Sequence, residues 1–295
     1  MAEGVDPVRV VASDQVVITA ALTGPIATKA DNPHLPTTPE EIAASARGAY
    51  EAGAAVVHIH LRDSDGRPTA DLDIARRTVA LVEEACPAII QLSTGVGLGV
   101  PYEERMALIE VRPRMATLNV GSMSFGAGEF SNPPDGVRRL ATRMAELGIR
   151  PELELYDSGH VELALALISE GLIESPVTCS LVLGVKGGMG ANARNLLHLV
   201  EQLPPDAIWQ VIAIGRANLA MTAIGLAMGG NARTGMEDTL MLRRGVPATS
   251  NAQLIERLVH LSAAVEREVA DVQAAEELFG LSKASLTAGH AGAAR

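Results

Sequence analysis

Short apolar runs alternate along this chain with longer stretches that have helical periodicity. Eight of the runs are four to seven residues long and rich in β-branched or other apolar side chains, which is typical of buried strands. The predicted strands cover residues 16–22, 55–61, 89–93, 115–119, 151–155, 178–183, 208–213 and 231–234. The last of these is the shortest and has the weakest apolar pattern.

The stretches between the strands predict helices. The clearest begins after Thr38, which suits the N-cap, with Pro39 at the first helical position and Glu41 at the capping-box position. The predicted helices cover residues 39–52, 73–85, 102–110, 135–147, 159–170, 192–202, 219–228 and 251–268. Eight strand and helix units in this order predict an α/β fold, a (β/α)8 TIM barrel.

A doubly wound sheet is the main alternative to the barrel. The first predicted strand, however, runs into Thr23-Gly24-Pro25-Ile26 and not into the Gly-x-Gly-x-x-Gly turn of a dinucleotide site. No linker or composition shift divides the 295 residues, so we expect residues 1–295 to form a single domain. Residues 1–15 are predicted to be a short N-terminal extension, and residues 284–295 a flexible C-terminal tail.

The composition and charge of the chain limit the kinds of partner that it can bind. The net charge is −11 and aromatic residues make up 2% of the chain, which argues against nucleic acid as a partner. Cys86 and Cys179 have apolar neighbours and suit small core residues. The start of the chain is acidic where a signal peptide is basic, and no apolar run reaches the roughly 18 residues of a membrane span. We therefore expect a cytoplasmic protein with no membrane contact.

The tripeptide His58-Ile59-His60 is the strongest sign of chemistry. Side chains two apart on a strand lie on the same face, roughly 6 to 7 Å from each other. Two imidazoles in this position suit Zn²⁺, which needs a further ligand, and Glu237-Asp238 offers carboxylates far downstream. The alternative is a pair of half-buried histidines that hydrogen-bond to the backbone. The buried character of the strand and the charged residues that follow it favour the metal.

Polar residues also end most of the other predicted strands, and the carboxyl ends of barrel strands are where active sites lie. Hydroxyl groups there could equally cap the following helices. Glu152 and Glu154 share one face, and if that face points inward at least one of them should pair with a cation such as Arg216 or Arg233. The polar residues at these ends are His58, His60, Ser93, Thr94, Thr117, Asn119, Glu152, Glu154, Lys186, Arg216, Arg233, Glu237 and Asp238.

With His58-Ile59-His60 and Arg233-x-x-x-Glu237-Asp238 together, the chain resembles the β-keto acid cleavage enzyme family, typified by 3-keto-5-aminohexanoate cleavage enzyme. The likeness extends from about Val17 to Leu281. Its most specific segments are residues 19–24, 35–41, 57–63, 91–95, 115–119, 182–185 and 250–252.

The resemblance implies a zinc-dependent acyltransferase with a (β/α)8 barrel. Such an enzyme converts a β-keto acid and acetyl-CoA, its co-substrate, into acetoacetate and a new acyl-CoA, and the family tends to form homotetramers. By the same resemblance, His58, His60 and Glu237 would bind Zn²⁺. Asp238 would be the general base, supported by Arg233 and Glu154. The substrate carboxylate would be held by Ser93, Thr117 and Asn119.

Some positions depart from the family pattern. Ile26 stands where the aminohexanoate-cleaving member has a glutamate suited to an ammonium group, so an apolar or uncharged substrate tail is expected. Asn231, Thr239 and Lys186 replace a common His, Asn and Pro near the mouth. Two other classes stay open at this point. One is a metal-dependent barrel hydrolase or lyase, and the other is a non-catalytic barrel that binds acyl-CoA or an organic acid.

Overall fold

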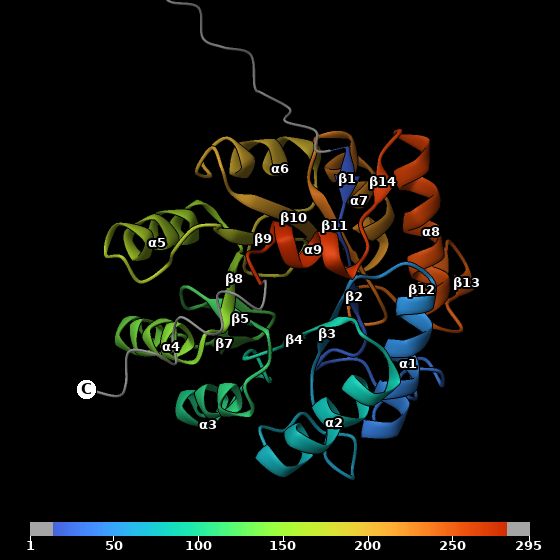
Figure 1. Cartoon of the computed structure of the whole chain (residues 1–295), viewed down its shortest axis with the longest axis horizontal. Coiled ribbons are helices and arrows are strands. Elements are labelled where there is room, and N and C mark those ends of the chain that lie inside the picture. Colours follow the sequence, from blue (N-terminus) through green and yellow to red (C-terminus); the bar gives the residue numbers. More distant parts are fainter. Residues whose placement is uncertain (1–13, 282–295) are drawn as a thin grey trace, which may run out of the picture.

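The computed structural model describes residues 14–281. Nearly all of the predicted extension and the whole of the predicted tail lie outside these residues. Eight parallel strands form a closed barrel in the order β10-β11-β2-β3-β4-β5-β8-β9 (Figure 1), which confirms the predicted (β/α)8 fold. The barrel strands are β2 (Ile18–Ala21), β3 (Val56–Ile59), β4 (Ile89–Leu92), β5 (Met115–Asn119), β8 (Arg150–Leu155), β9 (Thr178–Leu183), β10 (Ile208–Ala213) and β11 (Asn231–Thr234).

Helices surround the barrel, and each predicted helix is present with ends that differ by a few residues. At the start of α1, the Thr38 side chain accepts from the Glu41 backbone, while the Glu41 carboxylate accepts from the Thr38 backbone, which confirms the capping box. The helices are α1 (Pro39–Glu51), α2 (Leu72–Ala85), α3 (Tyr102–Ala107) with the 3₁₀ turn Leu108–Val111, α4 (Pro134–Leu147), α5 (Ser158–Ser169), α6 (Ala193–Val200), α7 (Asn218–Ala227) and α8 (Asn251–Ala264).

The predicted extent of the last helix is wrong. Helix α8 ends at Ala264, because Glu266 adopts a left-handed φ of 57° and Glu268–Val269 then form β14, which pairs with β1 (Gln15–Val16). An additional helix, α9 (Val272–Leu278), crosses the barrel axis in Figure 1. Its Ala275 packs with residues at the starts of strands, among them Val56 and Ile89, and so closes the amino-terminal end of the barrel.

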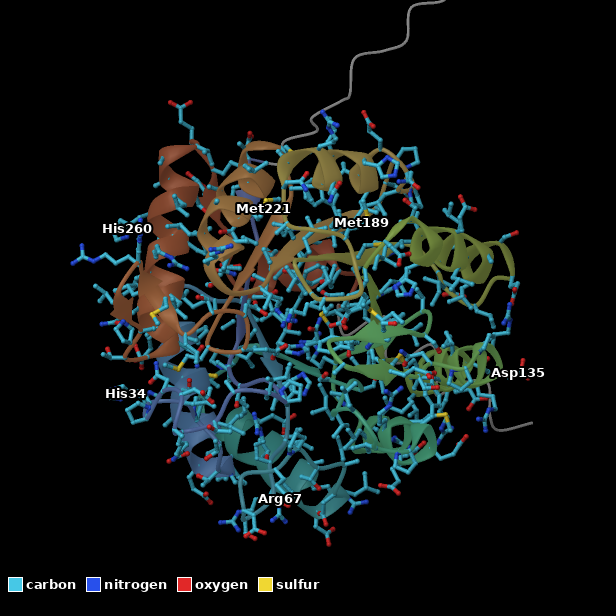
Figure 2. The ribbon with its side chains drawn as sticks, turned by 180° about the vertical axis from the view of Figure 1, so that it is seen from behind. His34, Arg67, Asp135, Met189, Met221 and His260 are labelled. Atoms are coloured by element: carbon cyan, nitrogen blue, oxygen red, sulfur yellow. The ribbon has the colours of Figure 1, made fainter. Side chains whose placement is uncertain are left out.

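The opposite face of the barrel is formed by the carboxyl ends of the strands and the loops that follow them. Two antiparallel hairpins that the periodicity did not predict are found in the loops after β5 and β11: β6 (Met123–Phe125) with β7 (Gly128–Phe130), and β12 (Met241–Arg243) with β13 (Val246–Pro247). Figure 2 views the molecule from behind, where Met189 marks the loop that follows β9. No helix in residues 14–281 is both long and apolar enough to cross a membrane.

The strands alternate between two environments. Side chains such as Val57, Ile59, Leu153 and Leu181 belong to the apolar clusters that strands and helices share. The alternate positions along the same strands carry buried polar side chains instead. They include His58, Gln91, Thr117, Glu152, Glu154, Ser180, Gln210 and Arg233. Because period-two alternation sends these groups to one face, the barrel interior beyond the apolar layer at the strand starts is rich in polar side chains and can support chemistry.

Candidate active site

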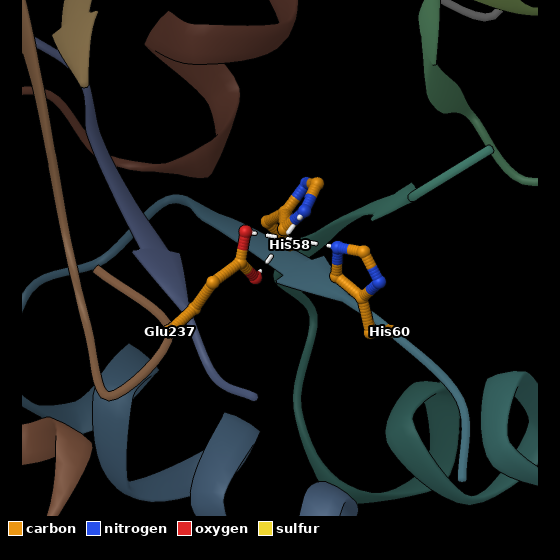
Figure 3. Close-up of side chains that lie close together, drawn as sticks. All are labelled: His58, His60 and Glu237. Atoms are coloured by element: carbon orange, nitrogen blue, oxygen red, sulfur yellow. Dashed lines mark ion pairs between the residues drawn. The ribbon is translucent and has the colours of Figure 1, made fainter. Parts of the chain in front are cut away.

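Three residues from two parts of the barrel converge on one point. His58 is on β3, His60 follows the last residue of that strand, and Glu237 is in the loop after β11. His58 Nε2 lies 3.5 Å from Glu237 Oε2, and His60 Nε2 lies 3.6 Å from Glu237 Oε1 (Figure 3). One ligand atom from each residue lies within 4.8 Å of the others. The strand order explains this proximity, since β2 alone separates β3 from β11.

The donor atoms suit a divalent cation. His58 Nε2 and Glu237 Oε2 are buried and have no hydrogen-bond partner among the described residues. Buried polar atoms are normally satisfied, so an unpaired nitrogen and oxygen that face each other indicate a missing partner. Two imidazole nitrogens and one carboxylate are a typical ligand set for catalytic zinc, which keeps a position open for substrate.

A residue that the sequence analysis missed orients the first of these ligands. The His58 Nδ1 atom lies 2.7 Å from the Gln91 side-chain oxygen, which can only accept, so Nδ1 carries the proton. The lone pair is therefore on Nε2, the atom that faces Glu237. The signals in the sequence were a polar residue within an otherwise apolar strand and its place in the segment 91–95 that resembles the family.

The charges on Glu237 and His60 suit a bound cation. Burial raises the pKa of Glu237, but Arg233, His58 and His60 outweigh it and hold that pKa well below the ordinary range. Glu237 is therefore ionised. Burial lowers the pKa of His60, which favours the neutral imidazole that a metal requires. Burial also opposes protonation of His58, but the Glu237 carboxylate prevails and raises its pKa, so a bound cation would have to displace a proton from Nε2.

Arg233 joins the two acidic residues. Its Nε donates to Asp238 Oδ2 at 3.1 Å and its Nη2 to Asp238 Oδ1 at 2.9 Å, and Nη2 also donates to Glu237. Burial raises the pKa of Asp238 although Arg233 opposes it. The turn that delivers both acids requires Gly235, because a Cβ there would lie 1.9 Å from the Ala21 carbonyl oxygen.

The three residues His58, His60 and Glu237 form a candidate metal site, referred to below as the metal cluster, which opens into a cavity of about 750 Å³. The polar side chains that line it are those of His60, Ser93, Glu154, Tyr156, Arg233 and Glu237, and Lys186 contributes an exposed cation. Its apolar wall includes Ile26, Leu98, Phe125, Phe130, Val182 and Ile212. In the described part of the chain, Asp238 is not among the residues that line the cavity; it lies behind Arg233 and Glu237, and is 1% exposed.

The three residues predicted to bind the substrate carboxylate differ in whether their polar atoms already have hydrogen-bond partners. Ser93 lines the cavity, and its hydroxyl accepts from the Gly95 amide at 3.2 Å. The Asn119 amide is buried with neither atom hydrogen-bonded within residues 14–281, but Asn119 and Thr117 are not among the described residues that line the cavity. Thr117 is more engaged, since its hydroxyl accepts from the Thr94 amide at 3.1 Å.

The inward glutamates, Glu152 and Glu154, do not form the expected ion pair with a cation. Ser180 Oγ and Gln210 Nε2 donate to Glu152 Oε1 at 2.6 and 3.0 Å. Glu154 accepts from the Tyr156 hydroxyl at 3.1 Å. Across residues 14–281 no ion pair joins either glutamate to an arginine, so the expected direct pairing with a cation is wrong. Neutral donors satisfy both acids, although Arg233 still acts on Glu154 through its charge.

Arg62 fixes the loop that carries Ile26. Its Nη2 donates to the Gly24 carbonyl oxygen, and to the Ala27 carbonyl oxygen at 2.8 Å. These two carbonyls flank Ile26, whose side chain is 70% exposed at the cavity mouth. Gly24 also touches the metal cluster, because a Cβ there would lie 2.6 Å from Glu237 Cγ. The position of the loop at residues 24–27 therefore affects the position of the Glu237 side chain, one of the three candidate metal ligands.

The chain is similar to known proteins over most of its length. Residues 15–281 match the family described as beta-keto acid cleavage enzyme. The 3-keto-5-aminohexanoate cleavage enzyme of Acetoanaerobium sticklandii is 39% identical over 272 residues, which cover 92% of this chain and 100% of that protein. The 3-oxoadipate:acetyl-CoA acetyltransferase of Cupriavidus necator is 37% identical over 90% of this chain and 94% of its own length.

A solved structure supports the fold. The apo structure of ObcA superposes with a TM-score of 0.74 at 23% identity, over 84% of this chain and 66% of ObcA. The family match covers nearly all of the described residues and includes both segments of the metal cluster. The chain therefore belongs to the β-keto acid cleavage enzyme family.

Proposed function

We propose that this protein is a zinc-dependent acyltransferase that converts a β-keto acid and acetyl-CoA into acetoacetate and a new acyl-CoA. The observation that carries the proposal is the convergence of His58, His60 and Glu237 on one point next to the cavity, with Arg233 beside them. Relatives that cover this chain almost completely are named as acetyl-CoA-dependent transferases and cleavage enzymes.

The proposed reaction begins with loss of a proton from the carbon between the keto and carboxylate groups. Zn²⁺ held by the three ligands would act as a Lewis acid that stabilises the resulting enolate. Asp238 is the proposed base. Its raised pKa makes it a stronger base than an ordinary aspartate, and Arg233 keeps it oriented. Because Asp238 lies behind the wall, the substrate must reach between Arg233 and Glu237.

The remaining steps exchange one carbon–carbon bond for another. The enolate carbon bonds to the thioester carbonyl carbon of acetyl-CoA, and the CoA thiolate leaves with the electron pair of the carbon–sulfur bond. The thiolate then adds to the original keto carbon. Cleavage of the adjacent carbon–carbon bond gives the new acyl-CoA and the enolate of acetoacetate, which takes back the proton from Asp238. No covalent bond to the protein is needed.

Residues around the cavity suggest the substrate. Ser93, Thr117 and Asn119 are proposed to hold its carboxylate, and the unpaired amide of Asn119 supports this role. Ile26 and the apolar wall favour an uncharged or apolar acyl tail. The homotetramer and the cytoplasmic location stay predictions from the sequence.

The test is to incubate the zinc-loaded protein with acetyl-CoA and a panel of straight-chain, branched, acidic and amino β-keto acids. We expect acetoacetate and the matching acyl-CoA in equal amounts, with the uncharged substrates preferred. A Glu237→Gln variant and chelator-treated protein are the controls and should be inactive. Binding without turnover for every substrate would instead indicate a non-catalytic barrel, and release of free acids would indicate a hydrolase.

A further inference from the structure

We propose that Tyr156 is a catalytic hydrogen-bond donor that stabilises the negative charge formed on the thioester oxygen of acetyl-CoA, with Glu154 orienting its hydroxyl. This inference rests on the proposed acyl-transfer function and deepens it. Glu154 and Tyr156 have a defined position in the barrel, the tyrosine ring has a fixed orientation, and within residues 14–281 no cation is in contact with Glu154.

The pair faces the metal cluster across the cavity. Glu154 is on β8, and Tyr156 follows the last residue of that strand. In the closed order of eight strands, β8 is four positions from β2 in either direction, so the two are diametrically opposite. The neighbours of β2, which are β3 and β11, carry or lead to the metal cluster. Glu154 and Tyr156 both line the cavity and therefore form the wall opposite that cluster.

The tyrosine ring is held in place from several sides. Its backbone amide donates to His160 Nδ1 at 3.3 Å, and the His160 ring packs edge-on against the Tyr156 ring at a centroid distance of 5.7 Å. The Tyr156 carbonyl accepts from the Met189 amide at 3.0 Å. Phe130 and Ile212 share its apolar cluster. A ring fixed by packing presents its hydroxyl without reorganisation, which is what transition-state stabilisation requires.

The Tyr156 hydroxyl makes few structural contacts. Among residues 14–281 its one hydrogen-bond partner is Glu154 Oε2 at 3.1 Å. Glu152, two residues before Glu154, has a structural role instead. Two neutral side chains, Ser180 and Gln210, donate hydrogen bonds to its Oε1 atom and hold it in place. Glu154 has instead a phenol on one side and the cavity on the other.

The protonation of the pair supports a donor role. Burial raises the pKa of Glu154, and the Arg233 charge only partly opposes this. Burial also raises the pKa of Tyr156 well above its ordinary value, so the phenol keeps its proton. When Glu154 is protonated, it donates to the Tyr156 oxygen, and the Tyr156 proton is free to point into the cavity. A neutral donor that is buried away from bulk water is worth more than the same donor in water.

The step assisted is the attack on the thioester. As the enolate carbon bonds to the carbonyl carbon, the π electron pair moves onto the carbonyl oxygen. Tyr156 donates a hydrogen bond to this oxygen and keeps its proton. When the carbonyl re-forms, the carbon–sulfur bond breaks and its electron pair leaves with the CoA sulfur. The enolate itself forms before acetyl-CoA takes part, so Tyr156 is not needed for that first step.

The decisive variant is Tyr156→Phe, which keeps the packed ring and removes the hydroxyl. We expect acetoacetate formation to fall by about 100-fold, a typical loss for one oxyanion donor. Exchange of the substrate's α-proton in D₂O without acetyl-CoA, followed by NMR, should stay within about threefold of wild type, and zinc content should not change. Glu154→Gln should lose less than about tenfold, because an amide N–H can donate to the tyrosine oxygen as a protonated carboxyl does.

Tyr102→Phe is the matched control. Its hydroxyl is buried and, unlike that of Tyr156, has no hydrogen-bond partner in the described chain; Tyr102 does not line the cavity, so loss of its hydroxyl should leave the turnover unchanged. Unchanged acetoacetate formation in Tyr156→Phe would overturn the inference, and so would a parallel loss of exchange and zinc, which would indicate a structural role. A wild-type protein with neither exchange nor transfer would overturn the proposed function and this inference together.

Discussion

His58 and Gln91 lie opposite each other on adjacent barrel strands, and the His58 Nδ1 atom is 2.7 Å from the Gln91 side-chain oxygen. This contact fixes the ring so that the free nitrogen faces Glu237. Partners of this kind typically affect metal affinity by 10- to 100-fold.

Replacement of Gln91 by Leu should therefore weaken zinc binding by about 10- to 100-fold, measured by competition with a chromophoric chelator. Gln91→Glu keeps an acceptor at the same place and should retain most of the affinity. Gln210→Leu is the control, because Gln210 is also a buried inward glutamine but contacts Glu152 and Ser180. Equal zinc affinity in Gln91→Leu and wild type would show that the contact does not orient His58.

Asp238→Asn tests the proposed base. The amide cannot accept the proton, so we expect acetoacetate formation to fall by about 100- to 10,000-fold while zinc stays bound. Exchange of the α-proton in D₂O should fall equally, in contrast to the Tyr156→Phe variant. An Asp238→Asn protein that exchanges and turns over normally would remove Asp238 from the mechanism.

Gly24→Ala should disturb the metal cluster from outside the ligand set. The new methyl would lie 2.6 Å from Glu237 Cγ, so the carboxylate must move. We expect zinc affinity to fall about tenfold, the lower end for changes that displace a ligand indirectly. Gly48→Ala is the control, since its methyl would meet nothing nearer than 3.8 Å and lies in helix α1. Matching zinc affinities for the two variants would argue against this contact.

Ile26→Glu should change the preferred substrate. A carboxylate at the cavity mouth would attract an ammonium group, so the ratio of kcat/KM for amino over apolar β-keto acids should rise by at least about tenfold, which corresponds to ~1.4 kcal/mol. Competition assays with paired substrates give this ratio directly. If wild-type protein already prefers ammonium-bearing substrates, the interpretation of Ile26 is wrong.

Glu41 links stability to pH through the capping box. Burial raises its pKa, but Lys29 and the Thr37 and Thr38 amides outweigh it, and the pKa falls to about 2. A folded-state pKa below the ordinary value of 4.5 means that its contribution is complete above pH 4.5 and is lost as the pH falls towards 2.

Glu41→Ala should therefore lower the free energy of unfolding of zinc-free protein by about 1 kcal/mol at pH 7, as for other lost caps. The difference from wild type should shrink at pH 3, and urea denaturation at the two pH values measures both. Glu51→Ala, which removes only an exposed pair with Arg47, should cost less than about 0.5 kcal/mol. A difference that is the same at pH 3 and pH 7 would contradict the assigned role of Glu41.

Much of the scaffold could be predicted from the sequence because its signals are local. The strands at 115–119, 178–183, 208–213 and 231–234 have the predicted bounds, since alternation and flanking turns define them within a few residues. The α1 capping box depends only on residues within one helical turn. Helix α9 was missed, because its contact with the strand starts is long-range and short segments give a weak periodic signal.

The sequence by itself determined the alternation of strands and helices, the caps and the residue types from which a metal site could be built. Only the tertiary structure decided which of these residues face the cavity. It placed Asp238 behind Arg233, gave Glu154 the Tyr156 hydroxyl in place of a cation, and brought Gly24 against Glu237. The physical reason is that backbone preference depends on neighbours along the chain. Burial and hydrogen-bond partners depend instead on groups that closure of the barrel brings together.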